Sequence, residues 1–264
     1  TAIGKGVVHE IFVHVDGDPD PYTCPNGVKM SDFQMPEVLE AKPRYDAHDK
    51  PTGDVDPCAG NGCFADDDFK AFSAPMGGRS RSVRIVYLNA TRGPGCAVHS
   101  LGHGWESTAG SGTLASVKTD FRRFANFDLD TRLGLPFENW YACSAADCIT
   151  YHGQNALTWK ADGKTGNVAK YDQGCGAVHF PPNARAQYDD QNAAPVLSTC
   201  ETFGIAGGKP AAYTDAKSGR YDKLAPDCEG GWQVYWRQSF PGLGNKAKHA
   251  DGTPMKSWWP YLFY

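Results

Sequence analysis

The chain has 264 residues, which is enough to bury a full hydrophobic core within one large β-rich domain. Its formal net charge is -4 and no run of lysine or arginine forms a basic stripe, so the composition argues against nucleic acid as a partner. No apolar run approaches the roughly 20 residues that span a bilayer, and we therefore expect no membrane partner.

Three segments alternate apolar and polar residues with period two, which predicts strands over 7–16, 81–90 and 232–240. Helical spacing is scarce, and 113–127 is the best candidate for a helix. Proline and glycine punctuate most of the remainder, as is typical of loops. We therefore predict a mainly β fold: a single β-sandwich or jelly-roll-like domain over residues 1–264, with long disulfide-anchored loops and little helix.

Nine cysteines, together with 30 glycines and 18 prolines, indicate a disulfide-bonded protein that is secreted and extracellular. The start at Thr1, without a charged and apolar leader, suits a mature chain whose signal peptide has been removed. Zinc is the competing role for the closely spaced cysteines, but zinc pairs usually have two intervening residues and these have four. The predicted bridges are Cys58–Cys63, Cys143–Cys148 and Cys175–Cys200, with one more shared among Cys24, Cys96 and Cys228.

The stretch CAVHSLGHGWES at 96–107 holds two histidines four residues apart. It lacks the glutamate of a zinc-binding HExxH helix, and Gly102 and Gly104 disfavour a helix. We therefore expect His99 and His103 in a strand end followed by a loop, where a turn would be needed to bring both to one metal. A metal role, an acid/base role and a structural role all stay open for this pair.

A second cluster follows the predicted bridge between Cys143 and Cys148. Tyr151 and His152 offer a proton donor and a base, and the amides of Gln154 and Asn155 could neutralise a substrate carboxylate. These groups suit proton abstraction beside a sugar carboxylate, whereas glycoside hydrolysis needs a pair of carboxylates. A polar loop whose side chains satisfy local backbone groups is the alternative.

A third cluster lies at 175–190, where two prolines stiffen the chain directly after His179. Asn183, Arg185 and Tyr188 follow as candidates for substrate binding. A structural loop in which Arg185 pairs with a neighbouring aspartate is the alternative.

The predicted strand over 232–240 would place Tyr235 and Arg237 on the face opposite its tryptophans. Such polar side chains could line a groove for an anionic or polyhydroxylated chain. No motif assigns a cofactor with certainty: the histidines allow zinc, and the aspartates within 16–20 and 66–68 allow calcium, although a solvated acidic turn explains them as well.

These patterns predict a secreted carbohydrate-active enzyme that cleaves an extracellular, anionic polysaccharide, with elimination slightly favoured over hydrolysis. His152 or His99 would be the base and Tyr151 the acid. The second hypothesis is a zinc-dependent hydrolase that uses His99, His103 and a third histidine, with Glu106 activating water. The third is a carbohydrate-binding or structural exoprotein without catalysis.

Overall fold

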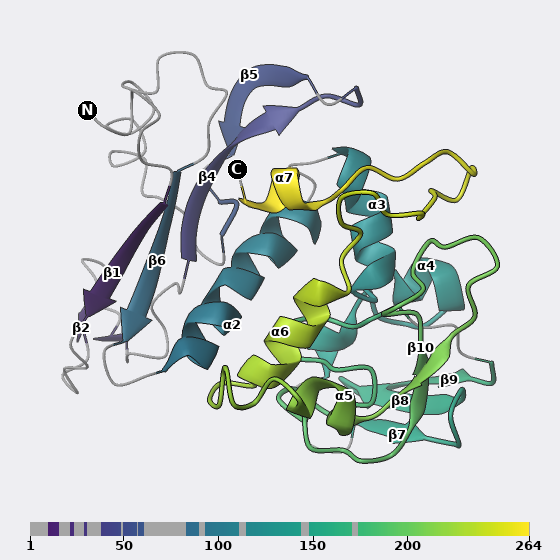
Figure 1. The fold of residues 1–264 in the computed structure, drawn as a ribbon. Helices are drawn as coiled ribbons and strands as arrows, with labels where there is room; N and C mark the ends of the chain where they lie inside the picture. The colour runs from purple at the N-terminus through teal and green to yellow at the C-terminus, as the bar shows by residue number, and fades with distance from the viewer. Residues whose placement is uncertain are drawn as a thin grey trace.

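The fold is described from a computed structural model of the chain (Figure 1). The structure describes residues 10–15, 22–23, 29–30, 38–48, 50–56, 58–60, 83–89, 93–110, 115–143, 148–170 and 174–263. Its strands are β1 (Glu10–Val15), β2 (Tyr22–Thr23), β3 (Lys29–Met30), β4 (Val38–Tyr45), β5 (Pro51–Asp56), β6 (Val83–Asn89), β7 (Ile149–Tyr151), β8 (Leu157–Ala161), β9 (Lys164–Val168), β10 (Val196–Ser198) and β11 (Ala211–Tyr213). Its helices are α2 (Pro94–Trp105), the π-helical turn η1 (Glu106–Gly110), α3 (Ala115–Phe124), α4 (Leu129–Leu133), the 3-10 turn η2 (Trp140–Ala142), α5 (Asp215–Gly219), α6 (Gly230–Gln238) and α7 (Trp259–Phe263).

Four of the described strands form one sheet in the order β1-β6-β4-β5. β1 and β6 run parallel, whereas β4 is antiparallel to both β6 and β5. Val38 and Val86 pair across β4 and β6 and are fully buried, so this part of the sheet faces the core. Within the described residues, β1 and β6 confirm the strands predicted over 7–16 and 81–90.

A buried ionic network joins this sheet to the C-terminal segment. The Arg84 guanidinium donates to both carboxylate oxygens of Glu40, at 3.0 and 3.1 Å, and to the backbone oxygen of Leu262 at 2.6 Å. The Lys42 ammonium donates to the backbone oxygen of Tyr261 at 2.7 Å. Buried charges need such partners, because an unpaired one is costly away from water. The network therefore fixes the end of the chain against β4 and β6.

Helix α2 lies between the sheet and α6: it packs against β4 and β6 on one side and against α6 on the other (Figure 1). Helix α3 packs against η1, and α5 packs against α6. Large buried rings fill the core around these helices and leave little room for movement. They include Trp105, Phe121, Phe124, Trp236, Phe240 and Trp258.

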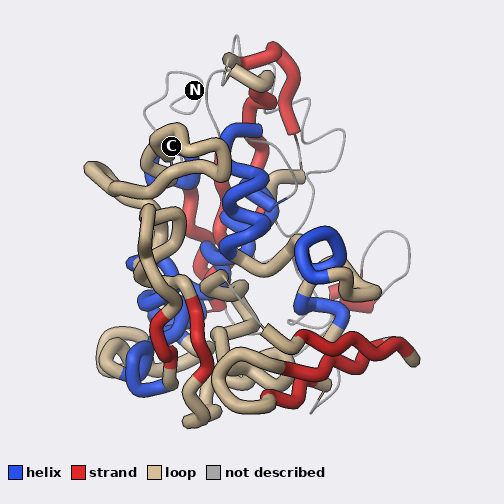
Figure 2. The backbone as a smooth tube through the Cα atoms, turned by 90° about the vertical axis from the view of Figure 1, so that its right-hand side faces the viewer, coloured by secondary structure: helices blue, strands red, loops and turns tan. Residues whose placement is uncertain are grey.

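A three-stranded antiparallel sheet, β7-β8-β9, lies away from the four-stranded sheet (Figure 2). Its central strand carries Trp159, which stacks on Trp140 with ring centroids 4.6 Å apart. Its first strand supports the segment 174–190, because the Ile149 amide donates to the backbone oxygen of Arg185 at 3.0 Å. This sheet therefore helps to position the segment that holds His179.

The prediction of a mainly β sandwich or jelly roll is wrong: the described residues form a mixed α/β fold with several small sheets. The segment predicted as a strand over 232–240 is mostly helix α6, in which Trp232, Tyr235 and Trp236 are buried at helical spacing. The segment that begins at Cys96, expected as a strand end and loop, belongs mostly to helix α2. The helix predicted over 113–127 is confirmed by α3.

The disulfides fit an extracellular protein. The predicted Cys143–Cys148 and Cys175–Cys200 bridges are confirmed, and Cys96 pairs with Cys228. Cys63, the predicted partner of Cys58, and Cys24, the third candidate for the remaining bridge, lie outside the described residues. None of the described helices combines the length and the apolar character that crossing a bilayer requires.

Candidate metal centre

Helix α2 carries two histidines of the candidate site. It begins at Pro94, whose fixed backbone angle suits the first helical position. The Asp227 carboxylate accepts hydrogen bonds from two backbone amides at this end, at 2.6 and 2.8 Å, and so satisfies donors that a helix start leaves unpaired. His99 and His103 are four residues apart on this helix, so their side chains share one face.

His179 approaches the same face from the segment 174–190. Helix α6 holds the residue before it, because Trp232 Nε1 and Gln233 Nε2 donate to the Val178 backbone oxygen at 3.0 and 2.7 Å. The Tyr188 amide donates to the His179 backbone oxygen at 3.0 Å and closes the loop that follows. His179 is thus fixed on both sides by contacts with its own segment and with α6.

Gly102 explains how α2 and the His179 segment come so close together. A Cβ atom at this position would lie 2.8 Å from Cγ2 of Val178 and 3.0 Å from Oε1 of Gln233. Only glycine fits this approach without a shift of its neighbours. The residue that weakens the helical signal in the sequence is therefore the one that allows the helix to pack here.

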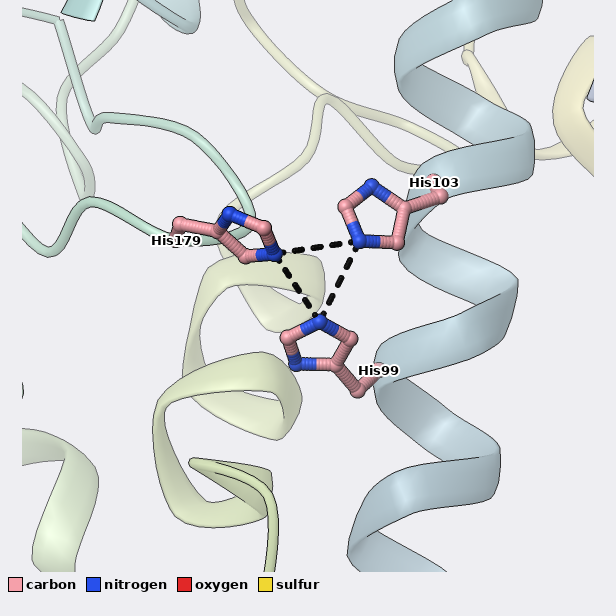
Figure 3. Close-up of side chains that lie close together, drawn as sticks. All are labelled: His99, His103 and His179. Carbon is pink, nitrogen blue, oxygen red and sulfur yellow. Dashed lines mark hydrogen bonds between the residues drawn. The ribbon is translucent and has the colours of Figure 1, made fainter. Parts of the chain in front are cut away.

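The Nε2 atoms of the three histidines point towards a common centre (Figure 3). They lie 3.1 Å apart for His99 and His179, 3.2 Å for His99 and His103, and 3.1 Å for His103 and His179. A ring nitrogen offers one proton or one lone pair in the ring plane, so hydrogen bonds among the three do not account for this convergence.

The nearly equilateral triangle fits three ligands of one divalent cation. Three nitrogens around tetrahedral zinc, with Zn–N bonds of ~2.0–2.1 Å, lie ~3.3 Å from one another. A square-planar centre would separate two of three nitrogens by ~4 Å. The observed distances of 3.1–3.2 Å therefore do not fit a square-planar centre and suit three ligands on one side of a tetrahedral or octahedral cation.

The outer nitrogens of two rings set their tautomers. His99 Nδ1 lies 3.2 Å from the backbone oxygen of Cys228, and His103 Nδ1 lies 3.2 Å from Oε2 of Glu106. Both oxygens accept, so each Nδ1 carries a proton, and in the neutral ring each Nε2 presents its lone pair to the centre. This is the arrangement that a metal-binding histidine needs.

Glu106 joins three parts of the site. Its Oε1 accepts from the Val178 amide at 2.6 Å, and its Oε2 accepts from the Tyr141 hydroxyl at 2.8 Å. Burial and the neighbouring Glu106 carboxylate raise the pKa of Tyr141 well above its usual value, so its hydroxyl keeps the proton that it donates. Glu106 therefore holds the end of α2, η2 and the His179 segment together while it orients His103.

His179 is neutral across the physiological pH range. Burial, with the imidazoles of His103 and His99 alongside, lowers its pKa to about 2. A neutral ring keeps its lone pair for a metal, whereas a protonated one would repel the cation.

Glu229 adds a buried acid beside this cluster. Its Oε2 lies 4.0 Å from His99 Nδ1, and neither carboxylate oxygen has a hydrogen-bond partner within the described residues. Burial and the carboxylates of Asp190 and Asp189 raise the pKa of Glu229 to about 9. Its backbone lies in the left-handed region, with φ at 55°, next to Cys228 at 49°.

The second predicted cluster contributes no side chain to the triangle. The Tyr151 hydroxyl lies 2.9 Å from the backbone oxygens of both Pro182 and Ala184, and burial raises the pKa of this phenol. His152 is exposed, with Nε2 2.9 Å from the Thr158 hydroxyl. Gln154 and Asn155 are exposed in the turn after β7.

The remaining predicted residues divide between the His179 loop and α6. Asn183 is buried and donates to the backbone oxygen of Ala194 at 3.2 Å, and Arg185 pairs with Asp189 at 2.7 Å. Tyr188 lies against His179 with ring centroids 4.0 Å apart and ring planes tilted by 35°. Tyr235 and Arg237 do not form a strand surface, because both are buried in helix α6.

Sequence reasoning missed Tyr141, Glu229 and the Cys228 carbonyl group. Pairing Cys96 with Cys228 would have placed residues 228–229 beside His99, but spacing alone left three cysteines as partners. The aspartates considered for calcium within 16–20 and 66–68 lie outside the described residues.

The arrangement can bind a cation through three preorganised imidazoles, two of which are oriented through their outer nitrogens. In the comparisons with known proteins, no family model, no curated protein and no solved structure matches this chain.

Proposed function

We propose that the chain is a zinc-dependent hydrolase whose metal is held by His99, His103 and His179. The observation that carries the proposal is the triangle of Nε2 atoms, 3.1–3.2 Å on each side. Imidazole nitrogen suits zinc and several other transition metals, and the triangle fits the tetrahedral geometry that zinc adopts.

The number of ligands supports catalysis over a purely structural role. Structural zinc sites usually have four protein ligands, whereas catalytic sites have three and an open position. Among the described residues, the group that converges here consists of three histidines. Zinc in such a site supplies a Lewis acid and lowers the pKa of water in the open position to about 7.

The roles of the surrounding residues follow from where their atoms lie. Glu106 faces Nδ1 of His103, the ring nitrogen opposite the centre, so it orients the ligand. This placement does not support the water-activating role that the sequence suggested for Glu106. The Cys228 carbonyl group orients His99 in the same way.

The first experiment titrates metal-free protein with Zn²⁺, and we expect one equivalent to bind. His103→Ala and His179→Ala should each weaken zinc affinity by more than the roughly 10–100-fold that loss of an orienting partner costs. His152→Ala is the matched control, because His152 is exposed and bonded to Thr158. The zinc affinity of this variant should equal that of the unsubstituted protein. No stoichiometric binding, or equal loss in all three variants, would contradict the metal site.

The second experiment tests hydrolysis separately. Zinc-loaded protein should cleave an activated ester such as p-nitrophenyl acetate, lose this activity with a chelator and regain it with added Zn²⁺. Zinc binding without any zinc-dependent cleavage would support a binding protein instead.

The polysaccharide substrate and the elimination reaction stay predictions. Tyr151 and His152, the acid and base proposed for elimination, do not contribute to the imidazole triangle, so hydrolysis has the better support. Secretion is likewise a proposal, supported by the disulfides.

A further inference from the structure

Tyr188 lies beside two of the three histidines. Its ring centroid is 4.0 Å from that of His179 and 6.0 Å from that of His99, and the Tyr188 and His99 rings are within 10° of parallel. The residue is nonetheless 56% exposed. Tyr188 is therefore both in contact with the site and reachable from solvent.

The backbone of Tyr188 is strained. Its φ is 64°, in the left-handed region that a bulky side chain rarely adopts. Strained backbones persist where the surrounding structure forces them, and they gather at functional sites.

The loop around Tyr188 supplies that force. The Arg185 guanidinium donates to both carboxylate oxygens of Asp189, at 2.7 and 3.0 Å, and the Arg185 amide donates to the same carboxylate at 2.9 Å. Together with the hydrogen bond from the Tyr188 amide to His179, these contacts fix the residues on either side of the ring. Packing alone does not explain the strain, because Tyr188 is 56% exposed.

We propose that Tyr188 is a specificity-determining residue that forms an aromatic wall beside the metal centre and stacks on a ring-bearing group of the substrate. This inference rests on the proposed function, because it assumes a metal at the three histidines. Aromatic rings attract flat apolar faces at centroid separations of about 4.5–7 Å, so a ring next to the scissile bond would gain contact with Tyr188. A substrate without such a ring would bind through the metal alone.

The test uses three hydroxamates that bind zinc through the same group: benzohydroxamate, cyclohexanecarbohydroxamate and acetohydroxamate. Zinc-loaded protein should bind the first more tightly than the third by about 2- to 12-fold, the range that aromatic stacking gives. A similar gain for the saturated ring would mean that the wall accepts any apolar ring face, and a gain for benzohydroxamate alone would mean that it requires an aromatic one. Either result supports the proposal.

Tyr188→Gly should remove the preference for benzohydroxamate over acetohydroxamate, while its zinc affinity stays within about twofold of that of the unsubstituted protein. Tyr188→Phe should keep it. A structural role predicts a lower melting temperature for Tyr188→Gly, whereas the proposal predicts an unchanged or higher one, because glycine adopts this backbone without strain.

Asp162→Gly is the matched control. Asp162 is also exposed and left-handed, with φ at 49°, but it lies in the turn between β8 and β9. Asp162→Gly should change the melting temperature as Tyr188→Gly does, and it should leave the preference among the hydroxamates intact. The inference is overturned if Tyr188→Gly keeps the preference, if the unsubstituted zinc protein shows none, or if only Tyr188→Gly lowers the melting temperature. Failure of the unsubstituted protein to bind zinc would overturn the proposed function and this inference together.

Discussion

At the scale of single residues, the fold keeps the buried carboxyl group of Glu229 protonated at neutral pH. Its usual pKa is 4.5, and in the folded chain its pKa is raised to about 9 by burial and by the carboxylates of Asp190 and Asp189. A group with a raised pKa stabilises the fold fully below its unfolded pKa, and this contribution is lost as the pH rises through the folded pKa. The affected window therefore runs from about pH 4.5 to 9.

We expect metal-free protein to lose stability between pH 7 and 8.5, by about 1 kcal/mol per pH unit. Glu229→Gln, which keeps the shape and does not titrate, should remove most of this slope. Urea unfolding at several pH values with a chelator present measures the free energy of unfolding directly. Parallel pH profiles for the two proteins would show that Glu229 is ionised in the folded chain.

The sequence identifies the three histidines as candidate ligands, but it does not show that they converge. His99, His103 and His179 could all be named as candidates, because histidines beside glycine, proline and cysteine are visible in the sequence. Their convergence could not be derived, since His179 is 76 positions from its 3.1 Å contact with His103. Tyr151 and His152 looked equally suitable, but Tyr151 bonds to two backbone carbonyl groups and His152 to a threonine. Chemistry suggests candidates, and tertiary contacts choose among them.

At the scale of elements, short aromatic and glycine-rich segments were the hardest to assign. The segment 232–240 places Trp232, Val234 and Trp236 two apart, and it also places Trp232, Tyr235 and Trp236 at the spacing of a helix. A segment of nine residues is too short to distinguish the period of a strand from that of a helix. In α2, Gly102 and Gly104 lower helix propensity, but packing against β4, β6 and α6 outweighs that loss. The pattern over 113–127, with apolar residues at helical spacing throughout, was assigned correctly as the helix α3.

Gly102→Ala tests the close approach of α2 to the His179 segment. The added methyl group gains about 1 kcal/mol of helix propensity, whereas crowding of a packed core costs about 1–3 kcal/mol. Val178 Cγ2, only 2.8 Å from the new Cβ, must move, and its backbone is bonded to Gln233. We expect a net loss of about 1 kcal/mol in the free energy of unfolding, together with weaker zinc binding because His179 follows Val178.

Gly104→Ala is the control for this substitution. It lies on the same helix and gains the same propensity, but its Cβ would meet Val38 at 3.3 Å and Glu40 at 3.4 Å, both on β4. Its zinc affinity should therefore equal that of the unsubstituted protein. Equal losses of zinc affinity in the two variants would mean that helix stability, and not the approach to His179, sets the affinity.

At the scale of the whole molecule, the order in which segments meet lies outside sequence reasoning. β1 pairs in parallel with β6, although the two strands are far apart in the sequence. The backbone oxygens of Leu262 and Tyr261, near the end of the chain, accept hydrogen bonds from Arg84 and Lys42 on the same sheet. Composition correctly indicated disulfides, but period-two alternation in three segments, with glycine and proline as loop signals elsewhere, predicted a sandwich. The contacts that overturned this are long-range, and a single sequence does not specify them.

The Cys96–Cys228 bridge connects this overall arrangement to the metal site. It spans 132 positions, and Cys228 also supplies the carbonyl group that orients His99. A bridge that closes a long loop removes more disorder from the unfolded chain than a short one does. The Cys143–Cys148 bridge spans only 5 positions, and the described contacts place neither of its cysteines against His99.

Replacing both cysteines of the long bridge by serine should therefore cost about 5 kcal/mol of stability, against about 2 kcal/mol for the short bridge. It should also weaken zinc binding by about 10–100-fold, because His99 loses a fixed partner for Nδ1. Urea unfolding and zinc competition on both double variants measure the two effects. Serine at 143 and 148 should leave zinc affinity unchanged, since that bridge does not orient a ligand. If both pairs weaken zinc equally, general loosening of the fold is responsible; if the long bridge alone matters, the Cys228 carbonyl group sets the geometry of His99.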